Sequence, residues 1–192
     1  NTLDYRIAAS QYLQSAQKDV FPRFGQTVKA TYRHTPFSKN DMGSILGVDA
    51  NFYFPGIFRH QGTWIYAGFQ QRNDKDVYGY SFSNLIAYPR GYHDAYDENL
   101  LSLRINYKLP LWYPDFSFGS VIYRKRLKIT LFYAWATGWN PGYINNYNST
   151  GCEVTADFHL LRFVAPVEMG LRTIYFPGSQ GWSFEFIYAI SY

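Results

Sequence analysis

Apolar and polar side chains alternate over unusually long stretches of this chain. Because successive side chains of a β-strand point to opposite faces, such a stretch predicts a strand with one apolar and one polar face. Residues 126–138, 150–160 and 167–176 follow this pattern. The clearest case is residues 100–109. Their odd-numbered positions are apolar or aromatic (Leu101, Leu103, Ile105, Tyr107 and Leu109), and the even-numbered positions between them are polar (Ser102, Arg104, Asn106 and Lys108). We call each such alternate set of positions a parity.

The length of these segments narrows the fold further. Each has about ten residues or more, as a strand tilted across a bilayer requires, whereas strands of soluble sheets most often have about 5 or 6. The polar faces are also strongly charged, since Glu153, Asp157 and His159 share one row. We therefore predict an all-β fold, a transmembrane antiparallel β-barrel whose apolar faces meet lipid. The expected strands, about ten in this chain, are residues 2–13, 26–34, 44–54, 61–72, 77–88, 100–109, 126–138, 150–160, 167–176 and 182–192. The alternation is fainter in 61–72 and 77–88 and poorest in 2–13.

The composition agrees with one barrel domain in lipid. Aromatic residues make up 21% of the 192 residues and charged residues 17%, and no apolar run is long enough for a transmembrane helix. An alternative is a ligand-holding barrel in water, which would turn the apolar faces inward. The connections favour the membrane barrel, because a short turn at 162–166 and a long polar loop at 138–150 are typical of its two ends.

The sequence shows no pattern typical of a protein that binds nucleic acid, a metal ion or a cofactor. The net charge of +4 comes from dispersed Lys and Arg residues, so we expect membrane lipid or lipopolysaccharide rather than nucleic acid as the neighbour. Cys152 is the single cysteine, and together with four scattered histidines it gives no disulfide, metal or cofactor pattern. The acidic run Asp94, Asp97 and Glu98 predicts a solvated loop rather than a calcium site.

The last segment, residues 182–192, ends on an aromatic residue. Its apolar and aromatic parity comprises Trp182, Phe184, Phe186, Tyr188, Ile190 and Tyr192. This ending is similar to the C-terminal sorting signal of outer-membrane barrels, which the assembly machinery binds by strand pairing. We therefore expect Tyr192 to be the natural C-terminus. Before Asn1 we expect either a removed signal peptide or a missing part of the protein.

A short motif, Pro89-Arg90-Gly91-Tyr92, follows the segment 77–88 and precedes a polar stretch. It resembles the Arg-Gly-aromatic motif in the sixth surface loop of the BamA/TamA superfamily, the "bacterial surface antigen" barrels that insert or translocate outer-membrane proteins. Five strands follow the loop in that family, and five are expected after the motif here. The resemblance implies the C-terminal part of a sixteen-stranded barrel, without its first strands and periplasmic modules. The strands of this chain alone would then not close.

In that family the loop folds back into the barrel, and its arginine contacts acidic groups of the inner wall. The resemblance therefore implies that Arg90 pairs with Glu153, with Asp157 and Glu168 as further candidates on the inward parity. A following strand of the family commonly carries Phe-x-Asp-x-Gly. This chain has Ala134 in place of the Asp, so the contact would run through Glu153 or be weaker. The alternative is an ordinary turn in which Arg90 is solvated and the next glycine has positive φ.

Three functions fit these predictions. The first is assembly or translocation of nascent outer-membrane or surface proteins in the bacterial outer membrane, through a seam at the last strand, without a cofactor, and with periplasmic modules and accessory lipoproteins as further partners. The second is a passive channel or structural surface barrel. The third is an outer-membrane hydrolase, for which His93 with Asp94, or Asp157 with His159, would be the candidate pairs. We predict the first, because it alone uses the motif around Arg90.

Overall fold

The computed structural model describes residues 2–13, 22–36, 43–75, 81–93, 95–112, 116–118, 122–160 and 167–190. These residues form one antiparallel β-sheet, which confirms the predicted all-β class. No helix long and apolar enough to cross a membrane occurs among them. Nine long strands follow one another across the sheet in chain order, and the short β6 lies off this path beside β7. The strands are β1 (Leu3–Tyr12), β2 (Gly25–His34), β3 (Gly43–Pro55), β4 (Gly62–Asp74), β5 (Asn99–Trp112), β6 (Phe116–Phe118), β7 (Ile122–Asn140), β8 (Tyr143–Leu160), β9 (Val167–Phe176) and β10 (Gly181–Ile190).

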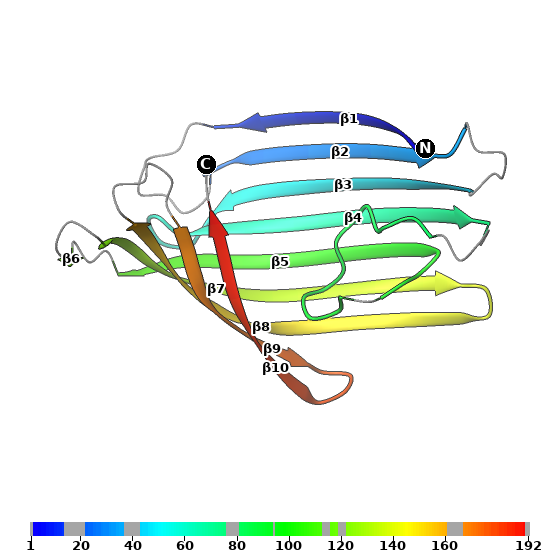
Figure 1. Ribbon diagram of the computed structural model, residues 1–192. Coiled ribbons are helices and arrows are strands. Elements are labelled where there is room, and N and C mark those ends of the chain that lie inside the picture. The colour runs from blue at the N-terminus through cyan, green and yellow to red at the C-terminus, as the bar shows by residue number, and fades with distance from the viewer. Residues whose placement is uncertain are drawn as a thin grey trace.

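The sheet is strongly twisted and open. In Figure 1, β1 to β5 run side by side, whereas β9 and β10 cross the view at a steep angle to them. Strands in a sheet rotate relative to their neighbours in one sense, so a sheet of this width coils. The two edges are β1 and β10, and no ladder joins them in the part of the chain that the structure describes. The sheet is therefore not closed into a barrel.

The two faces of the sheet differ as the alternation predicts. One face, which we call the inner face, is partly covered by residues 81–98, and many polar side chains near this cover are buried. Asn106 is fully buried there and Lys128 is 3% exposed, whereas on the opposite, outer face Leu171 is 65% and Phe184 77% exposed. This distribution is the reverse of a protein that folds around an apolar interior. The alternative of a barrel with its apolar faces inward does not agree with it.

One predicted strand is wrong. Residues 81–88 of the predicted strand 77–88 form irregular structure, because their backbone binds side chains of the inner face instead of another strand; residues 77–80 lie outside the described ranges. The segment 2–13, where the alternation is weak, nevertheless contains β1, which pairs with β2 over its whole length. The predicted short turn at 162–166 lies outside the described residues.

The predicted long polar loop at 138–150 is also wrong. The structure has a tight hairpin there, in which β7 continues to Asn140 and β8 begins at Tyr143. Gly142 has φ +90°, a backbone conformation that glycine adopts without steric cost. The many asparagine side chains of this stretch therefore belong to paired strands, where they can reach the inner face.

Candidate functional site

Residues 81–98, which we call the inner loop, lie across the sheet (Figure 1); Asp94 within this segment lies outside the described residues. The backbone of the described part belongs to no strand, so it needs other hydrogen-bond partners where it is buried. Side chains of β4 and β5 supply them. These bonds are Leu85 N and Ile86 N to Gln70 Oε1 (2.7 and 3.3 Å), Ala87 N to Tyr66 OH (3.0 Å) and Ser102 Oγ to Ala87 O (2.7 Å).

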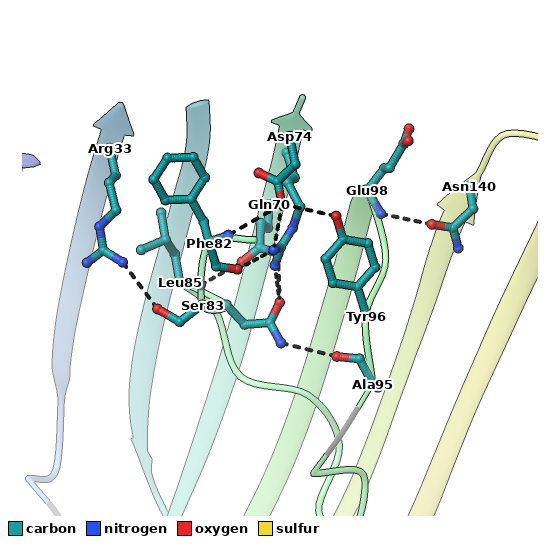
Figure 2. A network of polar contacts seen from close by, with 12 residues as sticks. Arg33, Gln70, Asp74, Phe82, Ser83, Leu85, Ala95, Tyr96, Glu98 and Asn140 are labelled. Carbon is teal, nitrogen blue, oxygen red and sulfur yellow. Dashed lines mark hydrogen bonds and ion pairs between the residues drawn. The ribbon is translucent and has the colours of Figure 1, made fainter. Parts of the chain in front are cut away.

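An ion pair at the end of β4 ties the start of the inner loop to its end. Phe82, Asp74 and Tyr96 lie close together there (Figure 2). The Arg72 side chain is almost fully buried and its Nη1 lies 3.2 Å from Asp74 Oδ2. Arg72 also donates to the Phe82 carbonyl and the Asn84 side-chain oxygen, and its guanidinium group lies 4.4 Å from the centre of the Tyr96 ring. Since Tyr96 OH donates to Asp74 at 3.0 Å, one buried pair organises both ends of the loop.

Asp97, near the end of the inner loop, is fully buried and accepts four hydrogen bonds. The donors are Tyr88 OH (3.0 Å), Tyr147 OH (2.8 Å), Asn145 Nδ2 (2.8 Å) and Asn140 Nδ2 (2.5 Å). Burial, followed by the charge of Asp97, raises the pKa of the Tyr88 phenol, so this hydroxyl stays protonated and donates. The prediction of a solvated acidic loop is therefore wrong for Asp97, because the β7–β8 hairpin surrounds this carboxylate with donors.

The Pro89-Arg90-Gly91-Tyr92 motif forms a turn against β9. Tyr92 N donates to Pro89 O at 3.2 Å, and Gly91 has φ +86°. The positive φ at Gly91 favours glycine, and a Cβ atom there would lie 2.4 Å from Cζ of Phe176, so the Phe176 ring would have to shift. The Tyr92 ring packs edge-on against the same Phe176 ring, with the centroids 5.3 Å apart. The turn thereby directs the Arg90 side chain toward the inner face.

Arg90 lies against the inner face and contacts a carboxylate there. Its Nε lies 2.8 Å from Glu153 Oε1 on β8, and its guanidinium group lies 4.4 Å from the centre of the Phe132 ring on β7. The Arg90 side chain is 11% exposed, so the alternative of a solvated arginine in an ordinary turn is wrong, although the positive φ at Gly91 is present. A cation above an aromatic ring and beside a carboxylate is stabilised by both.

Glu153 begins a row of alternating charges that crosses three neighbouring strands. Its Oε1 also accepts from Arg172 Nε at 2.7 Å, and Arg172 Nη1 lies 2.8 Å from Glu185 Oε2. Glu185 Oε1 lies 3.3 Å from His93 Nε2 of the inner loop. The three strand residues face one another in register, Glu153 opposite Arg172 and Arg172 opposite Glu185. Sequence reasoning missed Arg172 and Glu185 as site residues, although both lie on the inward parity of predicted strands.

The other predicted residues lie elsewhere. Asp157 Oδ1 and Glu168 Oε2 lie 2.6 and 3.0 Å from Lys128 Nζ, so the structure brings them to a lysine of the inner face and not to Arg90. The exposed outer face of β10 carries Phe184, Phe186 and Tyr188, whereas the side chain of Ile190 and all of Tyr192 lie outside the described residues.

The pairs considered for a hydrolase cannot be placed as predicted. Asp94 and the side chain of His159 lie outside the described residues, and their predicted partners His93 and Asp157 contact Glu185 and Lys128. In the described ranges, no group of three His, Cys, Asp or Glu residues could hold a metal ion. What the arrangement does is electrostatic: it holds the inner loop in one position on the sheet.

Comparison of the chain with protein-family models, curated proteins and solved structures gave no match. The resemblance of the motif around Arg90 to the BamA/TamA superfamily therefore stays a prediction.

We expect Asp97→Asn to destabilise the inner loop strongly. An amide keeps the shape of the carboxylate but removes its charge and turns an N–H group toward other donors. Hydrogen bonds to charged groups contribute about 1.5–3 kcal/mol each, so the free energy of unfolding in urea should fall by about 3 kcal/mol or more. Glu98→Gln is the matched control, because the Glu98 carboxylate points away from the polar contacts drawn in Figure 2, and it should cost less than about 0.5 kcal/mol. Equal effects would contradict this role of Asp97.

Glu153 serves two arginines, so losing its charge should cost more than losing one arginine. We expect Glu153→Gln to lower the free energy of unfolding by about 3–5 kcal/mol, and Arg90→Ala by less, because Arg172 still compensates Glu153. The double variant should be more stable than the sum of the single effects implies, by about 1 kcal/mol or more. Arg90→Lys should restore little, because an ammonium group lacks the planar fork of donors. Simply additive effects would show that the 2.8 Å contact carries no coupling.

Proposed function

We propose that this chain forms part of an outer-membrane β-barrel that assembles or translocates outer-membrane or surface proteins, as barrels of the BamA/TamA type do. The observation that carries the proposal is the position of Arg90, which the turn at Gly91 holds against the inner face, 2.8 Å from Glu153. Ala134 is fully buried on β7, where the family commonly has an Asp, and the carboxylate of Glu153 on the adjacent strand takes its place as the partner.

The outer face supports a location in lipid. Large apolar side chains such as Leu171 and Phe184 are exposed on it, and in water a continuous surface of this kind promotes aggregation. In a bilayer the same side chains would contact lipid tails, and the aromatic rings would lie near the headgroups. The buried polar face would then form the lumen wall. Membrane lipid and lipopolysaccharide are the neighbours that this arrangement implies.

The free edge of β10 supports a seam. β10 pairs with β9 on one side, and its other edge has no partner among the described residues. Backbone donors and acceptors on such an edge bind an added strand. We propose that nascent outer-membrane proteins pair with this edge, with their apolar side chains meeting lipid at once, while the inner loop keeps the wall behind the edge in shape. Strand pairing of this kind uses no cofactor and no covalent step.

A passive channel or structural barrel is the alternative, because a charged inner face also suits a water-filled pore. The inner loop argues against a wide pore, since it covers the inner face near β4, β5, β7 and β8 and is bound to it by hydrogen bonds. The two functions can be distinguished by experiment. A passive channel should show steady ion conductance and no effect on client folding, whereas an assembly barrel should promote client folding and conduct little.

Neighbouring side chains of β10 should meet different media. With Cys152 replaced by serine and the intact protein in lipid bilayers, Ser183→Cys should react with a water-soluble thiol reagent about ten times faster than Phe184→Cys, or more. A fluorescent label at position 184 should in turn be quenched by nitroxide lipids, and one at position 183 should not. Equal aqueous labelling of both positions would show that the outer face does not meet lipid.

Vesicles that contain the intact protein should accelerate the folding of an unfolded client barrel, followed by its heat-modifiable mobility on gels. Arg90→Ala should slow this by about ten-fold or more, because loss of the Arg90–Glu153 pair weakens the contact between the motif turn and the inner face. Arg59→Ala removes an exposed arginine in the β3–β4 connection and should leave the rate unchanged. Steady conductance in planar bilayers without client folding would favour the passive channel.

A further inference from the structure

A cavity of about 380 Å³ lies between the inner loop and the inner face. Three arginines from different parts of the chain line it: Arg90 of the inner loop, Arg104 of β5 and Arg172 of β9. His93 also lines the cavity, and its side chain is 73% exposed, so the cavity is open to solvent on that side. Arginines that gather around one solvent-accessible cavity produce a local positive potential.

The positive charge around this cavity is only partly compensated. Three guanidinium groups lie beside two carboxylates, because Glu153 contacts both Arg90 and Arg172, and Glu185 contacts Arg172. No described residue forms an ion pair with Arg104. The described part of the site therefore has one positive charge more than its carboxylates balance.

Two donor atoms of the arginines are buried without a hydrogen-bond partner among the described residues, Arg104 Nε and Arg90 Nη1. The cross-strand neighbours of Arg104 explain why. In register it faces Tyr66 on β4, whose ring lies 5.6 Å from its guanidinium group, and Ala134 on β7. Neither neighbour carries a negative charge, and a buried cation without a counter-ion is unfavourable. A small anion in the cavity, which both arginines line, would supply the negative charge that the site lacks.

We propose that this cavity binds a phosphate-type oxyanion, with Arg104 and Arg90 as its main ligands and Arg172 as a third. Guanidinium groups match the oxygens of phosphate in pairs, and several of them around one centre favour phosphate over a singly charged anion. The source is either inorganic phosphate or the phosphate of a lipid headgroup. The site goes beyond the proposed assembly function and does not require it, because it depends on the charge balance of the inner face.

The first test is titration of the intact purified protein with sodium phosphate, with sodium chloride holding the ionic strength constant. Calorimetry should show saturable binding, and the unfolding temperature should rise as phosphate replaces chloride, because a ligand that binds only the folded state stabilises it. An absence of saturable binding together with an unchanged unfolding temperature would overturn the proposal.

Two variants locate the site. Arg104→Gln should weaken phosphate binding by about ten-fold or more, whereas Arg59→Gln, which removes an exposed arginine elsewhere, should not change it. Ala134→Asp keeps every arginine but places a carboxylate opposite Arg104, so it should also weaken phosphate binding by about ten-fold or more. Equal losses in Arg104→Gln and Arg59→Gln, or undiminished binding by Ala134→Asp, would overturn the assignment.

The source of the phosphate is separated by competition. Dodecyl phosphate in dodecyl maltoside micelles presents a phosphate monoester on a lipid-like chain. If it displaces inorganic phosphate, and Arg104→Gln abolishes the displacement, the cavity accepts a headgroup. If only inorganic phosphate binds, the ligand is the free anion. If neither binds to the protein, the cavity is not an anion site.

Discussion

The inner loop can lie on the sheet only because side chains of the inner face supply the hydrogen bonds that another strand would otherwise supply. Irregular backbone buried against a sheet must find partners for its N–H and C=O groups. Gln70 accepts from two consecutive amides of the loop, and Arg72 binds a carbonyl near its start. Asp97 fixes its end to the β7–β8 hairpin. Together these side chains make the polar inner face a specific binding surface for the inner loop.

Charge pairing decides which residues can occupy the buried polar face. A buried ion without a partner is destabilising, so most cations of this face lie next to carboxylates, and Arg104 is the exception among the described residues. Lys128, for example, lies between Asp157 and Glu168, which leaves neither carboxylate free to approach Arg90. Glu153 makes that contact in addition to its pair with Arg172, because both arginines approach the same Oε1 atom. The nearest cation thus determines which partner each carboxylate has: Lys128 for Asp157 and Glu168, and the two arginines for Glu153.

Alternation and segment length predicted the strands and their faces, because both follow from the local geometry of a β-strand. They failed at 81–88, where alternating residues are held by side chains from distant strands, and at 138–150, where Asn, Gly and Pro suggested a loop. The contact of Arg90 with Glu153 was predicted from a motif resemblance and inward parity. The extension of that contact through Arg172 to Glu185 needed the register of three strands, which parity alone does not provide.

The row of charges from the inner loop to β10 links two places between which the described residues form no backbone hydrogen bond. When β10 separates from β9, Arg172 loses Glu185 and is left to share the Glu153 carboxylate with Arg90. Coupling between two sites is reciprocal, so if the pairing of β10 with β9 stabilises the position of the inner loop, the bound loop stabilises that pairing by the same free energy. If another strand bound to the free edge of β10 and changed its pairing with β9, the stability of the inner loop on the inner face would therefore change as well.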